Sequence, residues 1–561
     1  MNTFWGAVDA LNGALLSVPM LIALLAIGVL FTLWSGFCQW RSLTHGVALC
    51  AGKGIDTTHG EGALTHFQAL TAALSGTVGL GAIAGMAIAV EFGGPGAVFW
   101  MWAVGLIGMA LKSTEVTLSL LYRDTSEPGN PHGGSMYVLR NGLKDIHPSL
   151  AGIGKFVGGV FCVALLLFAV TGGNMFQTWT VADTTRVYLG VPSWISGLVI
   201  ATLAGIVLIG GIKRIGMVTK TLVPFKCGVY VLIGLYVILQ NADKLPEVFR
   251  SIFAGAFSGT EGVGAFVGGG MVTAFMFGMR RALFSSESGL GTAPIAHSAV
   301  KTPEPVTEGV VAGLEPFIDT IFVCTVTGLV ILTTGVWNRG PTVNWAAEPA
   351  FIEAAPGQWQ PATGLLPEAG KFAAGDPVFV VAQTSPAGAE SSAGTVPRKL
   401  ARIYGTVIDD EKGERIAWRP LTLDHAPILA ERGIFTDYRG ATLVAKSFDT
   451  VHPGLGGWLI TIAVWVFALS TLITYGYYGE QAITYLGLGA HVTPFRWLWC
   501  AAAAIACFGF IKGSEELDSI STVGMGFMYL INLPLMVIMG KRAMDAYHDY
   551  FRRLKAGQIA R

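Results

Sequence analysis

The sequence predicts an all-α integral membrane protein with about eleven transmembrane helices. Three observations indicate this fold class. Only 13% of the 561 residues are charged, whereas soluble domains carry roughly 25%. The mean hydropathy is +0.57. Apolar stretches of about 20 residues recur along most of the chain, and each is long enough to cross a hydrocarbon core of about 30 Å.

The predicted spans are the apolar stretches that are long enough to cross a bilayer. In chain order they are 14–37, 66–91, 97–121, 152–173, 193–211, 219–239, 262–283, 308–335, 457–486, 496–511 and 519–540. The first basic side chain is that of Arg41, so the stretch 14–37 lacks the positive flank of a signal peptide and is also too long to be one. We therefore expect it to remain as the first helix.

The charges of the short loops predict the orientation of the chain in the membrane. The loop that carries Lys213, Arg214 and Lys220 is basic, as is the C-terminal tail, whereas the loops 241–262 and 512–518 are net acidic. Because basic loops remain in the cytoplasm, we expect the N-terminus outside and the C-terminus in the cytoplasm. An odd number of spans agrees with this arrangement.

Residues 337–455 interrupt the membrane pattern, since they hold 24 of the 72 charged residues. Four short β-like runs lie between turn signals: Val378–Ala382, Leu400–Ile408, Arg415–Trp418 and Thr442–Phe448. The segment is therefore predicted to be a small β-rich domain outside the membrane, and a disordered insertion is the alternative. The chain divides into a first membrane part (1–336), this insertion (337–455) and a second membrane part with a cytoplasmic tail (456–561).

Two glycine-rich tracts lie inside predicted spans, at 75–85 in the second and at 268–278 in the seventh. If the first helix is an addition, these spans open two successive five-helix units. Interrupted helices at matching places in two halves indicate the binding site of a secondary transporter, because unpaired backbone in a membrane must face protein or a cavity. The alternative is that the glycines only allow close helix packing.

Composition excludes several other classes of function. The formal net charge is zero, with no clustered basic face for nucleic acid. The seven cysteines form no CxxC pair, so neither a zinc site nor a disulfide framework is predicted. No nucleophile–base or metal constellation has workable spacing, so we expect no enzyme, no cofactor and no metal other than a coupling ion. No obligate protein partner is evident.

Several segments form motifs of a recognisable kind: Phe92–Trp102, Gly108–Lys112, Glu115–Leu118, Gly210–Ile215, Leu222–Phe225, Leu283–His297, Phe317–Thr320 and Tyr477–Glu480. These motifs resemble those of the alanine/glycine:cation symporter family. The resemblance covers about 65–335 and 456–540. It implies a fold similar to that of the bacterial leucine transporter, with inverted five-helix repeats. It also implies sodium-coupled symport of alanine or glycine by alternating access, in a bacterial inner membrane.

The resemblance also implies which residues bind substrate and cation. Those expected at the small neutral amino acid are Thr77, Gly79, Gly81, Asn174, Gln177, Thr273 and Phe277. Those expected at sodium, through unwound carbonyls and hydroxyls, are Gly76, Val78, Ser470 and Thr471. Oxygen ligands of this kind suit a hard cation.

Ionisable residues inside or beside the spans are candidates for a gate or for coupling. Asp319 lies one turn from Glu315 and either binds a proton or cation or pairs with an arginine. Arg280 and Glu287 are expected at a cytoplasmic end or gate. Lys112 and Glu115 are three residues apart on one helical face, and we expect them to neutralise each other.

The sequence departs from the family pattern at two places. Ala82 and Ser286 stand where the family motifs have asparagine. Two amide side chains near the interrupted helices are therefore missing, which leaves the substrate and the coupling ion open. A proton-coupled carrier of a related solute is the first alternative. A transporter-like membrane sensor that uses 337–455 as its ligand domain is the second.

Overall fold

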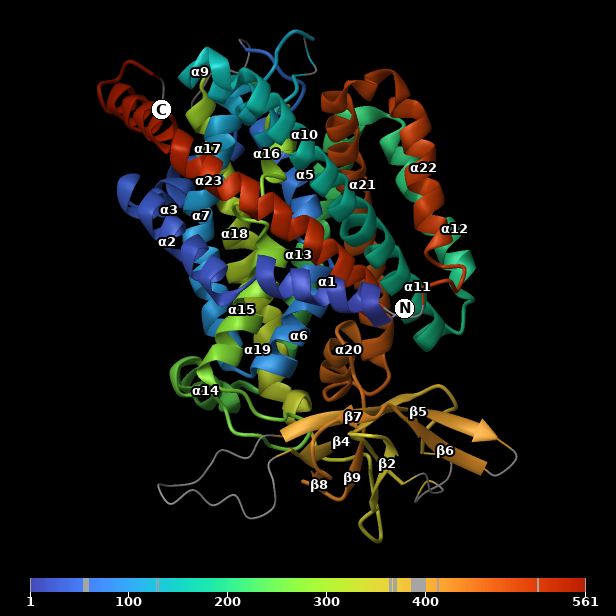
Figure 1. Ribbon diagram of the computed structural model, residues 1–561. Coiled ribbons are helices and arrows are strands. Elements are labelled where there is room, and N and C mark those ends of the chain that lie inside the picture. Colours follow the sequence, from blue (N-terminus) through green and yellow to red (C-terminus); the bar gives the residue numbers. More distant parts are fainter. Residues whose placement is uncertain are drawn as a thin grey trace.

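A body of long helices carries a small β region at one end, and the C-terminus lies at the opposite end (Figure 1). The computed structural model describes residues 2–53, 60–127, 129, 131–362, 366, 371–384, 400–410, 413–511 and 514–559. Within them, seven helices are long and apolar enough to cross a membrane, or eight if one bent pair counts as a span. The mostly helical fold is thus confirmed.

The first half of the helical body runs to residue 240. Its helices are α1 (Asn2–Leu15), α2 (Val18–Trp34), α3 (Cys38–Arg41), η1 (Ser42–Gly46), α4 (Val47–Cys50), α5 (His66–Thr77), η2 (Gly81–Gly85), α6 (Met86–Gly93), α7 (Gly96–Tyr122), α8 (Ser135–Tyr137), η3 (Val138–Gly142), α9 (Leu143–Ile146), η4 (Pro148–Leu150), α10 (Ala151–Phe168), η5 (Ala169–Met175), α11 (Phe176–Leu189), α12 (Ser193–Leu208) and α13 (Gly211–Gln240).

The second half completes the bundle. Its helices are η6 (Ala242–Lys244), α14 (Leu245–Ser258), α15 (Met271–Ser286), α16 (Ala293–His297), α17 (Pro305–Ala312), α18 (Leu314–Pro316), η7 (Phe317–Val323), α19 (Cys324–Thr334), η8 (Val336–Asn338), α20 (Ala441–Asp449), α21 (Leu455–Ile483), η9 (Thr484–Leu488), η10 (Gly489–His491), α22 (Val492–Ile505) and α23 (Ser514–Lys555).

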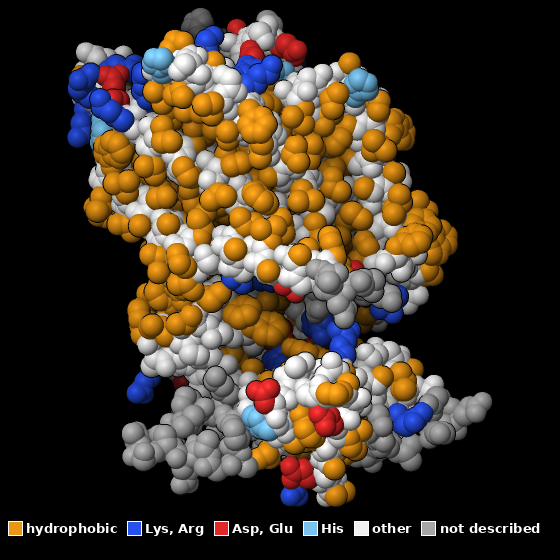
Figure 2. Space-filling view, in the orientation of Figure 1, with side chains coloured by type: hydrophobic (Ala, Val, Ile, Leu, Met, Phe, Trp, Pro, Cys, Tyr) orange, Lys and Arg blue, Asp and Glu red, His pale blue; other side chains and the backbone are white. Residues whose placement is uncertain are grey.

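The outer surface of the helical body is apolar. Figure 2 shows hydrophobic side chains covering the visible face of the body, with charged side chains gathered at its two ends. Large side chains such as Phe156, Leu232 and Leu239 are about 70% exposed. Monomeric soluble proteins rarely expose contiguous apolar patches of such extent. This surface is suited to lipid.

Two predicted spans differ from the structure. The stretch 262–283 is helical only from Met271, because Thr260 and Gly269 pair as a short bridge and Gly268 has a φ of +81°. The helix that follows runs unbroken through Gly278. The glycine tract 268–278 was therefore wrongly predicted to interrupt a helix. The first span, 14–37, is divided at Ser17, where α1 ends and α2 begins.

The β region consists of two antiparallel sheets. The larger has the order β1 (Val343–Asn344), β9 (Gly433–Thr436), β4 (Pro377–Gln383), β5 (Leu400–Asp410), β6 (Gly413–Trp418), and β8 (Ile428–Leu429) also pairs with β4. The smaller joins β2 (Phe351–Ala355), β3 (Gln358–Pro361) and β7 (Leu421–Thr422). Alternate residues of β4 and β5, such as Val378, Val380 and Val407, point to one face of the larger sheet and form a separate core of the β region.

Three of the four predicted β-like runs are strands, and the fourth is wrong. Residues 442–448 lie in α20, which packs against α21 and α19. Ala441, Val444, Ala445 and Phe448 are all buried, and their spacing of three and four residues is that of a helix. The strands thus end at Thr436, and α20 belongs to the helical body.

Candidate functional site

The first interruption separates α5 from η2 and α6. The two parts are bent by 52°, and the break falls at Val78, Gly79 and Leu80. Here the Gly79 N–H donates to the Thr77 carbonyl at 2.7 Å, and the Ala82 N–H donates to the Gly79 carbonyl at 3.3 Å. The Val78 carbonyl is therefore available to a side chain. The first N–H groups of a helix have no preceding turn to bond, although here the Ala82 N–H is bonded within the break.

Helix α21 is bonded to α5 by hydroxyl groups. The Ser75 hydroxyl donates to the Ser470 carbonyl at 2.7 Å, and the Thr471 hydroxyl donates to the Ser75 and Gly76 carbonyls at 3.2 and 3.4 Å. A Cβ atom on Gly79 would lie 2.5 Å from the Thr471 hydroxyl, so this close approach requires glycine. The four predicted sodium ligands, on α5, at the break and on α21, therefore do lie together.

A buried lysine, which is not among the predicted site residues, lies among those residues. Lys226 of α13 donates from Nζ to the Val78 carbonyl at 2.6 Å and to the Ser470 hydroxyl. Its Nζ is 4.8 Å from the centre of the Phe467 ring, and the residue is 3% exposed. A charged residue inside an apolar span is a functional candidate by default, and that signal was present at position 226.

The second interruption follows α15, between Glu287 and Thr292. Glu287 has a φ of +51°, which is uncommon for a residue other than glycine and costs about 1–3 kcal/mol. Gly289 and Gly291 also have positive φ. The segment lies within the longest family-like motif, Leu283–His297, rather than in the predicted glycine tract 268–278.

Side chains from four other helices hold this second break. The Glu287 carboxylate accepts from the Tyr475 hydroxyl and, at 2.6 Å, from the Thr292 hydroxyl. Glu115 accepts from the Gly291 N–H at 3.1 Å, and the Asn532 amide donates to the Gly289 carbonyl at 2.8 Å. The Asn532 oxygen in turn accepts from the Ser135 hydroxyl at 2.6 Å.

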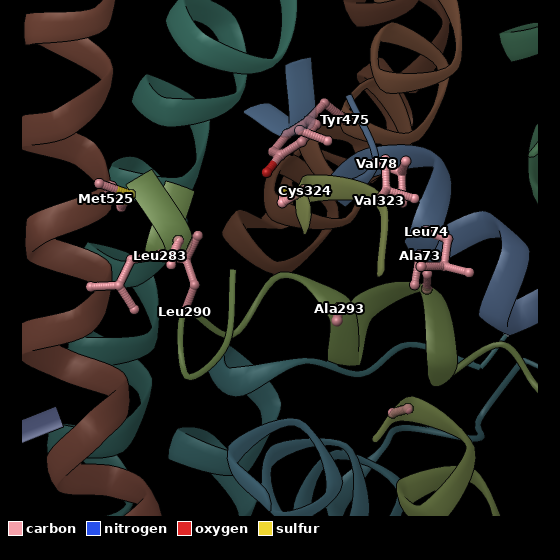
Figure 3. Packing of buried hydrophobic residues seen from close by; sticks show 14 of the residues in the cluster. Ala73, Leu74, Val78, Leu283, Leu290, Ala293, Val323, Cys324, Tyr475 and Met525 are labelled. Atoms are coloured by element: carbon pink, nitrogen blue, oxygen red, sulfur yellow. The ribbon is translucent and has the colours of Figure 1, made fainter. Parts of the chain in front are cut away.

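The two breaks approach each other in the core. A Cβ atom on Gly81 would lie 3.2 Å from the Ser285 Cα. The Ser285 hydroxyl donates to Asp319 of η7 at 2.7 Å, and the Thr327 hydroxyl donates to the Ala82 carbonyl at 3.0 Å. In Figure 3, Val78 and Val323 of η7 appear on one side of the cluster, and Leu283 of α15 and Leu290 of the second break appear on the other. Thus η7 and α19 bridge the two interruptions.

Three predicted site residues lie away from the paired breaks. Phe277 stacks on Phe92 at 5.3 Å between ring centres, and Thr273 lies one turn nearer to the start of α15. Both therefore lie toward the β region. Arg280 donates to the Leu16 carbonyl at 2.8 Å, where α1 meets α2. The predicted group of Arg280, Glu287 and Asp319 is not assembled, because the arginine is held by backbone elsewhere.

The remaining predicted residues are buried near the breaks. Thr77 donates weakly to the Ala73 carbonyl at 3.5 Å. The Asn174 amide donates to the Trp499 carbonyl at 2.9 Å, and the Gln177 amide donates to the Gly172 carbonyl at 3.2 Å. Within the part of the chain that the structure describes, the side-chain oxygens of Asn174 and Gln177 have no hydrogen-bond partner.

A chain of buried ionisable groups connects α5 with the helices beyond the second break. His297 lies 2.5 Å from Glu308 and 2.7 Å from Glu315, and His66 contacts the other Glu308 oxygen. Lys112 pairs with Glu315 at 3.4 Å. The expected neutralisation of Lys112 by Glu115 is thus replaced by a pair with a different helix, and Glu115 instead bonds the backbone of the second break.

An apolar helical bundle whose two interrupted helices meet in its core is a multi-pass membrane transporter in class. The comparison with known families agrees. The sodium:alanine symporter family matches residues 1–362 and 426–561, and the chain belongs to this family. The resemblance found in the sequence is confirmed. The unmatched segment 363–425 falls in the β region.

Known proteins similar to this chain carry related names. The sodium/alanine symporter AgcS of Methanococcus maripaludis is 34% identical over 483 residues, which are 86% of this chain and 84% of that protein. The putative sodium/proton-dependent alanine carrier protein YrbD of Bacillus subtilis is 30% identical over 555 residues, covering 98% and 93%. Among solved structures, a manganese transporter of Eremococcus coleocola has a TM-score of 0.44 at 10% identity, covering 85% of this chain and 78% of that one.

Proposed function

We propose that this chain is a secondary active symporter that moves a small neutral amino acid, alanine or glycine, together with a cation, by alternating access. The observation that carries the proposal is the approach of Gly81, just after the first break, to Ser285, just before the second. In secondary transporters, the binding site lies where the interrupted helices of two halves meet. Such a site can open to each side of the membrane in turn.

The substrate carboxylate is proposed to bind at Gly79 and Gly81. The helix that restarts at Gly81 directs the N–H groups of its first turn and the positive end of its dipole toward the break, and both attract an anion. Thr77 and the unpartnered oxygens of Asn174 and Gln177 are the polar groups proposed to face the rest of the amino acid. Thr273 and Phe277 are proposed to line the approach from the outer end instead of the pocket itself.

The proposed membrane arrangement has one added helix followed by two inverted five-helix repeats. The first repeat opens with α5 and α6, and the second opens with α15 and α16. The loop between α12 and α13 and the C-terminus would face the cytoplasm, and the β region, α14 and the N-terminus would lie outside. The support is that the basic and acidic loops lie at opposite ends of the body, as the positive-inside rule requires.

The coupling cation is proposed to act at the place where α5, α13 and α21 meet, beside the first break. Asp319 and Glu287 are the carboxylates proposed to link the two breaks during the transport cycle. They lie on η7 and at the end of α15, and Ser285 bonds directly to Asp319. Sodium, which the family description names, is the first candidate for this cation, and a proton is the alternative.

The experiment that tests the transport proposal is exchange, because it needs no ion gradient. Liposomes that contain the purified protein and are preloaded with unlabelled L-alanine should take up radiolabelled L-alanine. Preloaded liposomes without protein are the control and should not. Competition with glycine, D-alanine and serine would define the substrate class. The proposal would be overturned if the protein took up no labelled L-alanine. It would also be overturned if an excess of unlabelled L-alanine, glycine, D-alanine or serine never inhibited that uptake.

A further inference from the structure

We propose that a groove between α13 and α21 binds one acyl chain of a membrane phospholipid, whose polar end lies at Tyr236 and His452. The groove has two connected parts of about 390 and 170 Å³, and both parts have Ile233 and Phe448 in their walls. Because the occupant is a lipid, the site does not depend on which solute or ion the protein carries.

The groove opens on the apolar outer surface of the helical body. Phe225 and Leu232 on the α13 side and Ile462 on the α21 side are all more than half exposed. The groove is thus continuous with the surface that is suited to lipid. A water-soluble ligand could reach it only through the hydrocarbon core, where polar groups are costly. Its occupant is therefore a hydrocarbon.

The length of the groove matches one leaflet of a bilayer. Its wall runs along α13 from Phe225 to Val237 and along α21 from Leu455 to Phe467. Each stretch advances by 12 residues, which is about 18 Å at a rise of about 1.5 Å per residue. One leaflet contributes about 15 Å, half of the hydrocarbon core. A single lipid chain that lies along the two helices therefore fills the groove from end to end.

A helix of a second protein is too wide for the groove. A helix about 10 Å in diameter fills on the order of 1,400 Å³ over a length of about 18 Å. The two parts of the groove together offer less than half of that volume. An acyl chain is narrow and flexible, so it can pass from one part into the other.

Polar groups mark the end of the groove that lies nearer to the β region. The Tyr236 hydroxyl lies 2.9 Å from Nε2 of His452, and their rings are stacked with 5.6 Å between centres. Both residues are exposed, and α20 and the start of α21 lie at this end of the body (Figure 1). Tyrosine is enriched at membrane–water interfaces. Whichever of the two side chains donates to the other, one O–H or N–H remains for a phosphate or ester oxygen of the lipid.

The deep end of the groove reaches the residues that support the first break. Its wall includes Tyr230, Lys226 and Phe467, and Nζ of Lys226 is bonded to the Val78 carbonyl and the Ser470 hydroxyl. A lipid chain gains no hydrophobic energy by moving here from the bilayer, because lipid tails are as apolar as leucine. Close packing and the polar end therefore hold it, and the packed chain supports α13 and α21 behind the first break.

The test uses a phosphatidylcholine in which one acyl chain ends in a photoreactive diazirine. The full chain is reconstituted into dioleoyl phosphatidylcholine liposomes that contain this probe. It is then dissolved in detergent, freed of unbound lipid and irradiated, so that only retained lipid can label it. Peptide mass spectrometry locates the label. We expect the label on the deep wall of the groove, at Phe225, Val229 and Val466.

Two variants test whether the label reports the groove. Ala463→Trp fills the groove from α21, so this label should fall by about tenfold or more. The matched control Ala501→Trp adds the same side chain at an exposed position of α22 and should leave the label unchanged. Tyr236→Phe combined with His452→Leu removes the polar end and should lower the label by about tenfold.

Three results would overturn the lipid site, and none of them depends on transport. The first is a wild type that retains no probe. The second is label spread evenly over exposed residues elsewhere, such as Phe156 and Leu203. The third is groove label that persists in Ala463→Trp. If Ala463→Trp does not fold, Val229→Trp fills the groove from α13 and takes its place, and the distribution of label in the wild type still decides.

Discussion

The two interruptions of the helical bundle are built from different chemistry. The first break is bonded by neutral groups and one amine: hydroxyls of α21, backbone carbonyls of α5, and Lys226 of α13. The second break is bonded by carboxylates and an amide, from Glu287, Glu115 and Asn532. The first is the place where we propose that a carboxylate and a cation bind. The second is anchored by buried anionic groups from several helices, so its shape depends on its neighbours.

This contrast predicts that the first break tolerates no added side-chain volume. Gly79→Ala should lower L-alanine exchange by about a hundredfold, because its Cβ would lie 2.5 Å from the Thr471 hydroxyl and push α5 from α21. The measurement is the initial exchange rate in liposomes. The matched control is Gly85→Ala in the same tract, where the nearest atom, Cδ of Arg281, is 3.9 Å away. Equal rates in the two variants would contradict the account of the first break.

The second break should depend on the hydrogen bond between the Glu287 carboxylate and the Tyr475 hydroxyl. Glu287→Gln removes a charged acceptor that two hydroxyls share, so exchange should fall by about tenfold to a hundredfold. Tyr475→Phe removes one of these bonds from the other side. Because the two residues are in contact, the double variant should lose less than the product of the single losses. Strictly multiplicative losses would show that the Glu287–Tyr475 bond does not act in transport.

The β region should contribute to stability more than to transport. Arg402 of β5 contacts Glu91 of α6 and donates to the Ala265 carbonyl at 2.7 Å. Arg402→Met leaves a buried carboxylate unpaired, so the free energy of unfolding should fall by about 3 kcal/mol. Thermal unfolding in detergent measures this, and Arg432→Met is the control because its pair with Glu348 is exposed. If Arg402→Met lost exchange at a temperature at which the protein remains folded, the β region would instead take part in the transport cycle.

The smallest effect is expected at Phe277, which was predicted to line the pocket but lies away from the breaks. Phe277→Leu should lower the free energy of unfolding by about 1 kcal/mol through the lost stacking on Phe92. The alanine concentration that half-saturates exchange should not change. A strong rise in that concentration would instead show that Phe277 lines the pocket, as the family resemblance implies.

Sequence patterns located the first break and misplaced the second for one physical reason. Glycine density reports freedom of the backbone but not whether a helix continues through it. At Gly79 and Gly81 the missing side chain allows a close approach to Thr471 and Ser285, whereas Gly268 turns a loop before α15 and Gly278 lies within an intact helix. The second break is formed by Glu287 in a left-handed conformation, which its neighbours impose.

The long-range contacts of the site could not be predicted from a single sequence. Lys226 is 148 residues from Val78 and 244 from Ser470, so no local spacing connects them. The charge inside an apolar span was visible, but its partners were not. Similarly, the pair of Lys112 with Glu315 required the packing of α7 against α18, whereas helical spacing favoured Glu115. By contrast, the strand runs 378–382, 400–408 and 415–418 are marked by local signals, short β-like runs between turn residues, and were predicted correctly.

The most direct test of the central claim is an experimental density map of the protein with saturating L-alanine. The account predicts a ligand with its carboxylate at the first break, beside the start of the helix at Gly81, and its remainder facing the segment from Ser285 to Glu287. Density for alanine elsewhere in the bundle, or α5 running straight into α6 beside it, would contradict the claim.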